Sequence, residues 1–176
     1  EIVKELAKDM GVKLVIVPTE WKTLVNGIVS NKYDISTSAS LSVKRALSTG
    51  YTDSYFKLAT VPLALKKNLN QFTSWEDINR KNIKVAVTLG TTQEQQAKQL
   101  FPNAILNIIE SPARDFQEVL SGRSDVHITS NIEASSLVKK YPELGIIPVK
   151  EPKYPTPLAW LTPQGDQVWI NYLNHW

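Results

Sequence analysis

The sequence predicts an α/β fold in which parallel strands alternate with helices. From residue 83 onward, short apolar and β-branched runs are each followed by a longer segment with helical periodicity. Such alternation is typical of a parallel sheet that helices cover on both faces. Hydrophobic residues make up 42% of the 176 residues, which suffice for one ordinary domain or for two small lobes.

Turn, capping and breaker residues set the bounds of the expected elements. Pro62 interrupts the apolar run 57–66, which is therefore expected to be an edge strand or a bent one. The polar stretch 68–82 carries one short helix signal, from Ser74 to Asp77, and is expected to lie near the crossing between lobes. The expected helices cover residues 1–10, 21–29, 42–47, 93–100, 113–120, 132–140 and 166–173. The expected strands cover residues 13–17, 33–36, 57–66, 83–87, 104–109, 125–129, 146–149 and 158–161.

Composition excludes several classes of function. The net charge is +3, but the basic residues are scattered among acids, and the nearest approach to a cluster is Arg80, Lys81 and Lys84, so no nucleic-acid partner is expected. The chain has no cysteine and two histidines, which excludes disulfides, thiolate metal sites and cysteine nucleophiles and argues against a zinc site. We expect no metal and no cofactor. The apolar runs fall well short of the ~20 residues of a membrane helix.

The first ten residues have apolar side chains at helical spacing, but no capping residue precedes them. A chain that begins inside a helix is expected to be N-terminally truncated. The absence of a signal peptide is therefore uninformative.

Three loops lie where open α/β sheets bind ligands, beyond the carboxyl ends of strands and at helix N-termini. They are 37–42, 90–93 and 130–133. In the first, Thr37, Ser38 and Ser40 are followed by Arg45. Hydroxyls and backbone N–H groups can hold one carboxylate oxygen while the planar guanidinium reaches the group. A serine-rich helix cap beside a surface arginine also explains this segment on its own.

The second loop, 89–94, has the sequence LGTTQE and opens a helix. Its glycine permits a tight turn, and threonine N–H and hydroxyl groups at a helix start suit an anion. The loop lacks the spacing and the lysine of a phosphate loop. On its own, it is explained by a helix cap.

Taken together and in order, these segments resemble the amino-acid-type (family 3) periplasmic solute-binding proteins of ABC importers, over essentially the whole chain. The resemblance implies a two-lobed, periplasmic-binding-protein-like fold of type II, with residues 1–70 in an incomplete lobe I, 83–149 in lobe II and 150–176 returning to lobe I. The motifs that carry it in the first lobe are VPTEW (17–21), NKYD (31–34), residues 38–45 and YTDSYF (51–56). Those in the second are LGTTQE (89–94), LSGRSDV (120–126) and residues 132–140.

Matching positions carry the family's ligand contacts onto this chain. The resemblance implies that Arg45 grips a ligand carboxylate, assisted by Ser40 and the N–H of Thr92. Thr37 and Ser38 line the same wall, and Trp21 stacks over the ligand from that lobe. Ser130 and Glu133 belong with Thr92 to the opposite wall. For Trp21 the alternative of an aromatic core anchor at a helix start is also open.

One position departs from the family's pattern. After the strand 125–129, amino-acid binders of this type usually place an aspartate that pairs with the ligand's ammonium, whereas this chain has Ser130. Loss of a charge-assisted hydrogen bond costs about 1.5–3 kcal/mol, which puts an ordinary α-amino acid in doubt. Either Glu133 replaces the missing charge, or the ligand has no N–H to satisfy. A quaternary ammonium held by cation–π attraction or a plain organic anion fits the second case.

The resemblance implies a periplasmic, monomeric receptor that captures a small carboxylate-bearing or zwitterionic solute by hinge closure and docks on the membrane subunits of an ABC importer. The alternative is a cyclohexadienyl (prephenate or arogenate) dehydratase-like enzyme. Ile132-Glu133 matches the segment in which these enzymes carry a glutamate as general acid, although they also tend to keep the aspartate that Ser130 replaces. A sensory ligand-binding module is a third interpretation.

Overall fold

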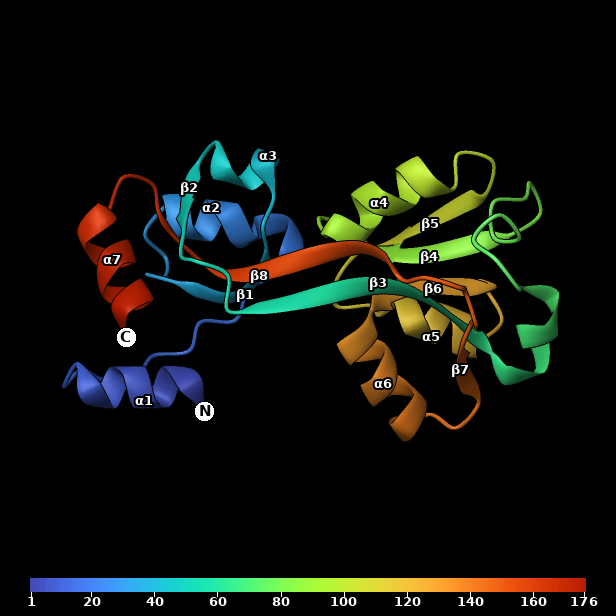
Figure 1. Cartoon of the computed structure of the whole chain (residues 1–176), viewed down its shortest axis with the longest axis horizontal. Coiled ribbons are helices and arrows are strands. Elements are labelled where there is room, and N and C mark those ends of the chain that lie inside the picture. Colours follow the sequence, from blue (N-terminus) through green and yellow to red (C-terminus); the bar gives the residue numbers. More distant parts are fainter. The chain divides into compact units, whose positions relative to one another are not determined.

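The computed structural model describes all 176 residues, which form two compact units. Unit 1 comprises residues 1–57 and 157–176, and unit 2 comprises residues 58–156. The chain passes between the units within two long strands, β3 (Phe56–Leu65) and β8 (Lys153–Pro163) (Figure 1). The sequence instead placed the crossing around 68–82. That stretch belongs to unit 2 because Phe72, Trp75 and Ile78 are buried in the core of that unit.

In unit 1, β8 lies between two short antiparallel strands, since Leu161 of β8 pairs with Ser36 on one side and with Tyr51 on the other. Helix α2 packs on this sheet through Leu24 and Ile28. The helical elements of unit 1 are α1 (Ile2–Asp9), η1 (Trp21–Thr23), α2 (Leu24–Val29), α3 (Val43–Ala46) and α7 (Gln167–His175). Its short strands are β1 (Ser36–Ser40) and β2 (Thr49–Tyr51).

Helix α1 ends as the sequence predicted. Gly11 adopts a left-handed conformation with φ +64°, and the N–H groups of Gly11 and Val12 return to the carbonyls of Lys8 and Ala7. This is the glycine-terminated helix end in which only a residue without Cβ is unstrained. The helix packs through Leu6 against Trp160 and Leu173.

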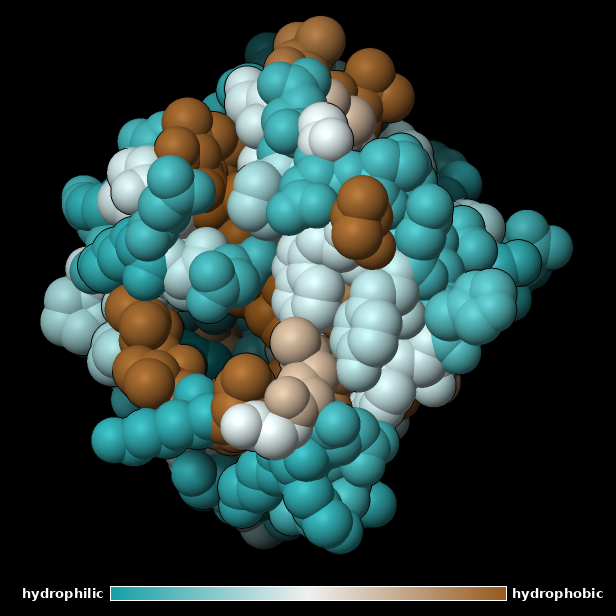
Figure 2. All heavy atoms as spheres, turned by 90° about the vertical axis from the view of Figure 1, so that its left-hand side faces the viewer, coloured by the Kyte–Doolittle hydropathy of each residue, from teal (hydrophilic) through white to brown (hydrophobic).

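The expected strand 13–17 is wrong. The segment has no regular secondary structure, and the side chains of Val15 and Ile16 are 69% and 75% exposed. Strand propensity acts only where a neighbouring strand offers pairing, and no strand of unit 1 pairs with this segment. It borders a cavity of about 970 Å³ that is also lined by α1 and α7. Figure 2 shows hydrophobic surface around a hollow on this side of unit 1.

Unit 2 contains the predicted alternation of strands and helices, but its sheet is mixed. β4 runs parallel to β5 and β6, whereas β3 runs antiparallel to β6 and β7. The expectation that Pro62 marks an edge strand is wrong, because it pairs with Ile128 while its carbonyl accepts the N–H of Ile147 on the other side. The strands are β4 (Lys84–Thr88), β5 (Ile105–Ile109), β6 (Val126–Ser130) and β7 (Leu144–Ile146). The helices are η2 (Lys66–Gln71), α4 (Thr92–Leu100), α5 (Asp115–Leu120) and α6 (Asn131–Lys140).

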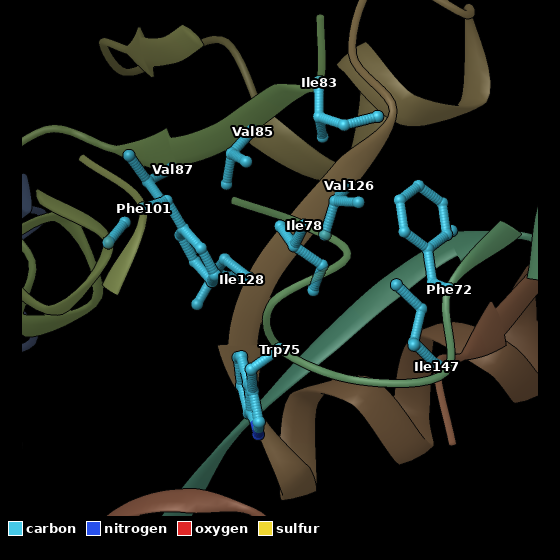
Figure 3. Close-up of a cluster of buried hydrophobic side chains, with 12 residues drawn as sticks. Phe72, Trp75, Ile78, Ile83, Val85, Val87, Phe101, Val126, Ile128 and Ile147 are labelled. Atoms are coloured by element: carbon cyan, nitrogen blue, oxygen red, sulfur yellow. The ribbon is translucent and has the colours of Figure 1, made fainter. Parts of the chain in front are cut away.

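The core of unit 2 is a continuous apolar cluster (Figure 3). Val85 and Val87 of β4 meet Val126 and Ile128 of β6, and the stacked rings of Trp75 and Phe101 lie 6.0 Å apart. The expected helix signal at Ser74 to Asp77 makes the two reciprocal hydrogen bonds of a capping box, but only a turn follows it. None of the helices combines the length and the apolar character of a membrane-spanning segment.

Candidate functional site

Unit 1 brings together three of the residues that the sequence singled out. Arg45, on α3, is 9% exposed, and its Nη1 donates to the carbonyl oxygen of Ser40, 3.4 Å away. Its guanidinium carbon lies 5.8 Å from the ring centroid of Trp21, within cation–π range. Trp21 is 42% exposed, so the alternative in which this ring anchors the core is wrong. A buried guanidinium thus lies against an exposed indole.

Thr37, Ser38 and Ser40 lie on β1, where the sequence predicted a loop. The pairing of β1 with β8 is irregular between Ser36 and Ala39, which takes Thr37 and Ser38 out of the regular ladder. Their polar groups are therefore available for contacts other than those of the sheet. The side chain of Ser38 is exposed, and that of Thr37 is half-buried.

Two tyrosines donate hydrogen bonds to carbonyl groups of this strand. Sequence reasoning did not assign either of them to the site. The Tyr51 hydroxyl donates to the carbonyl of Ser40 over 3.0 Å, and the Tyr55 hydroxyl donates to the carbonyl of Thr37. Burial raises the pKa of the Tyr51 phenol, and the nearby Arg45 charge partly offsets that rise. The YTDSYF motif contained both residues, but it carried no sign of which carbonyls they would contact.

In unit 2, the turn before α4 is held by its own side chains. The Thr91 hydroxyl accepts the N–H of Glu94 over 3.1 Å and donates to the carbonyl of Thr88 over 2.7 Å. Gly90 has φ +81°, and its N–H donates to the Glu94 carboxylate over 2.7 Å. Thr92, the predicted ligand contact, is the first residue of the helix. Helix starts of this kind present N–H groups to anions.

Ser130 and Glu133 lie at the start of α6. The Ser130 hydroxyl caps the helix by accepting the N–H of Glu133 over 3.1 Å. Arg114 lies 3.5 Å from Oε1 of Glu133, and the hydroxyl of Thr129 donates to Oε2. Arg114 was not predicted, since nothing in the sequence places it near α6. Because β4 and β6 are parallel neighbours, α4 and α6 both begin at the same edge of the sheet.

The predicted residues therefore fall into two sets, one in each unit. Unit 1 carries Trp21, Thr37, Ser38, Ser40 and Arg45, and unit 2 carries Thr92, Ser130 and Glu133. No three histidine, aspartate or glutamate side chains are grouped so that they could hold a metal ion.

Comparison with protein families identifies the chain. The model of the bacterial extracellular solute-binding proteins, family 3, matches residues 1–176. The chain belongs to this family. The sequence-based assignment to the amino-acid-type binding proteins is thereby confirmed.

Two characterised classes of relative share this family's sequence pattern. The cyclohexadienyl dehydratase of Pseudomonas aeruginosa is 26% identical over 177 residues, with 100% of this chain and 66% of the relative covered. The L-cystine-binding protein of Escherichia coli K12 is 26% identical over 141 residues, with 80% of this chain and 52% of the relative covered. The chain thus spans about half to two thirds of the length of these relatives.

Solved structures confirm the type II fold of periplasmic binding proteins. An ancestral amino-acid-binding protein, described as a precursor of cyclohexadienyl dehydratase, is 33% identical and superposes with a TM-score of 0.90 over 99% of this chain and 74% of its own. A putative ABC-transporter binding component from Wolinella succinogenes, complexed with lysine, is 30% identical with a TM-score of 0.90, covering 99% and 75% of the two chains.

Proposed function

We propose that the chain is part of an extracytoplasmic solute-binding protein that captures a small carboxylate-bearing or zwitterionic, amino-acid-like solute for an ABC importer. The observation that carries this proposal is the buried Arg45 guanidinium held against the exposed ring of Trp21. Family membership and the amino-acid-binding relatives support the same class of ligand.

The chemistry of this pair suits a carboxylate. A guanidinium presents N–H donors in a planar fork that matches the two oxygens of a carboxylate. Burial lowers the local dielectric and strengthens the attraction between the two charges. The exposed Trp21 ring supplies an apolar surface for the rest of a small ligand. Ser40, whose carbonyl is already held by Arg45 and Tyr51, belongs to the same wall.

Unit 2 carries the other residues that the family resemblance assigns to ligand binding. Thr92 offers its N–H at the start of α4, and Ser130 and Glu133 offer polar groups at the start of α6. Glu133 carries the negative charge that Ser130 lacks, but it already has Arg114 as an ionic partner. A ligand ammonium has to compete with that guanidinium. A net anionic or zwitterionic ligand with a weakly held ammonium fits this charge balance better than a cation.

The second candidate is a dehydratase-like enzyme, which the match of the whole of this chain to 66% of cyclohexadienyl dehydratase favours. In that reaction Glu133 would act as the general acid. Here Oε1 of Glu133 faces Arg114, and Oε2 accepts the hydrogen bond of Thr129. Both carboxylate oxygens are therefore already engaged within unit 2. We therefore propose binding rather than turnover.

We also propose that the protein is a monomer and that its partners are the membrane subunits of the importer.

A thermal-shift screen over the common amino acids, betaines and small carboxylates tests this proposal. A ligand present at a hundred times its dissociation constant stabilises the folded form by about 2.7 kcal/mol. For a chain of this size, that corresponds to a rise in melting temperature of about 5–11 °C. The proposal predicts such a shift with at least one amino-acid-like compound and no turnover of prephenate. Loss of prephenate at enzyme-like rates favours the dehydratase, and no shift with any compound contradicts the proposal.

A further inference from the structure

We propose that Thr88 and Asp115 are positioning residues that hold the 90–92 turn in its ligand-binding shape. This inference rests on the proposed function for its consequence in binding, because Thr92 is one of the proposed contacts. The claim that Thr88 and Asp115 hold the turn depends only on contacts within unit 2.

The proposal begins with a buried carboxylate. Asp115, the first residue of α5, is only 6% exposed. Its Oδ2 accepts the hydroxyl of Thr88 over 2.8 Å, and its Oδ1 accepts the N–H of Phe116 over 3.0 Å. Nδ1 of the buried His127 lies 3.5 Å from Oδ2, and neither nitrogen of this imidazole has a hydrogen-bond partner. A buried carboxylate is costly unless it is bonded, so the Thr88 hydroxyl is a strongly held partner.

Thr88 connects the Asp115 carboxylate to the turn. It is the last residue of β4, and its carbonyl oxygen accepts the hydroxyl of Thr91 over 2.7 Å and the Thr91 N–H over 3.4 Å. Thr91 in turn caps α4 by accepting the N–H of Glu94. The hydroxyl bond to Asp115 fixes the side-chain rotamer of Thr88, and the carbonyl of the same residue holds Thr91. Asp115, Thr88, Thr91 and the first turn of α4 thus form one continuous chain of hydrogen bonds.

The turn needs an anchor of this kind because of Gly90. A glycine at φ +81° is unstrained, but it also gives the turn more backbone freedom than any other residue would. The bond from the Gly90 N–H to the Glu94 carboxylate restrains the turn only with respect to α4 itself. The Thr88–Asp115 contact instead ties the residue that holds Thr91 to α5, in addition to its pairing with β5 in the sheet. Without it, we expect the end of β4 and the turn bonded to it to shift relative to α5.

Hydrogen–deuterium exchange and ligand titration on three variants test the proposal. Thr88→Val keeps the shape and removes the hydroxyl, whereas Thr88→Ser keeps the hydroxyl. The matched control is Ser124→Ala, which removes another buried hydroxyl of unit 2, bonded to Asn107 rather than to the turn. Exchange is measured in the ligand-free protein on peptides covering residues 89–94, and binding is measured with the zwitterions L-cystine and L-histidine.

The proposal predicts that Thr88→Val accelerates exchange in residues 89–94 by about threefold to tenfold, the effect of losing about one hydrogen bond. It predicts that Thr88→Ser and Ser124→Ala exchange like the parent in this segment. Where an amino acid binds the parent protein, we expect Thr88→Val to bind it more weakly by a similar factor and Thr88→Ser to bind it with the affinity of the parent. Unchanged exchange in Thr88→Val, or equal acceleration in Thr88→Ser, overturns the proposal.

A second variant keeps the test decisive if Thr88→Val does not fold. Asp115→Ala removes the other end of the same contact and is expected to accelerate exchange in residues 89–94 in the same way. Parent-like exchange there overturns the proposal. Accelerated exchange in a protein that binds neither amino acid supports the positioning role. The thermal-shift screen then decides separately whether the proposed function fails.

Discussion

The Arg45→Ala substitution is expected to remove most ligand affinity while leaving unit 1 folded. A charge-assisted hydrogen bond between a guanidinium and a carboxylate contributes about 1.5–3 kcal/mol, so its loss weakens binding by about tenfold to 150-fold. The low exposure of Arg45 places the effect toward the upper end, because a carboxylate left without its partner in a buried position is strongly disfavoured.

The cost to folding is smaller. The side chain loses its contact with Trp21, which is worth about 0.5–1 kcal/mol, and its hydrogen bond to the Ser40 carbonyl. The bond from the Thr49 hydroxyl to the backbone carbonyl of residue 45 does not depend on the side chain and is retained. We expect the melting temperature of the ligand-free protein to fall by a few degrees, about 2–6 °C.

The assay is isothermal titration calorimetry with the compound that gives the largest thermal shift. Lys44→Ala is the matched control, because it removes a positive charge from the same helix at an exposed position. The account predicts at least tenfold weaker binding for Arg45→Ala and less than a twofold change for Lys44→Ala. Equal affinities in the two variants would refute the role of Arg45 as the carboxylate anchor. The loss of affinity would then reflect only the removal of one positive charge from this helix.

Three further predictions concern the rest of the chain. Hydrogen bonds from Thr73 lower the pKa of Asp77 to about 2. The ionised carboxylate therefore contributes stability above about pH 4, and this contribution is lost as the pH falls toward 2. Asp77→Asn should flatten the pH dependence of the urea unfolding midpoint between these pH values. The pKa of Tyr51 should rise further in Arg45→Ala, measured as a later onset of tyrosinate absorbance on alkaline titration. Phe101→Ala should destabilise the protein by about 3–5 kcal/mol, measured by urea unfolding, because the fully buried ring stacks on Trp75; a loss below about 1 kcal/mol contradicts that packing.

Local signals were sufficient for much of unit 2. Capping residues and apolar periodicity placed α4, α5 and α6 within a few residues of their observed bounds, because each helix is bounded by its own neighbours in sequence. Strand predictions failed where pairing decides the outcome. Residues 13–17 have the composition of a strand but no partner. The strand 57–66 was predicted within one residue of its observed bounds, but its Pro62 lies between two neighbours rather than at an edge.

The candidate site was only partly predictable for the same reason. Arg45, Trp21 and Thr92 were proposed from their motifs, which lie in short continuous segments. Tyr55, Arg114 and Asp115 contribute through contacts with residues far along the chain, which no local pattern encodes. The Ser130 hydroxyl, expected to face a ligand, is engaged in capping α6, a contact that the sequence allowed but did not single out.

The central claim is that the ligand is held by its carboxylate, and a comparison of the best-binding compound with its carboxamide analogue tests it most directly. Calorimetry on the parent protein should show the amide binding about tenfold to 150-fold more weakly than the acid, with that difference lost in Arg45→Ala. Equal affinity of the parent protein for acid and amide would contradict the account.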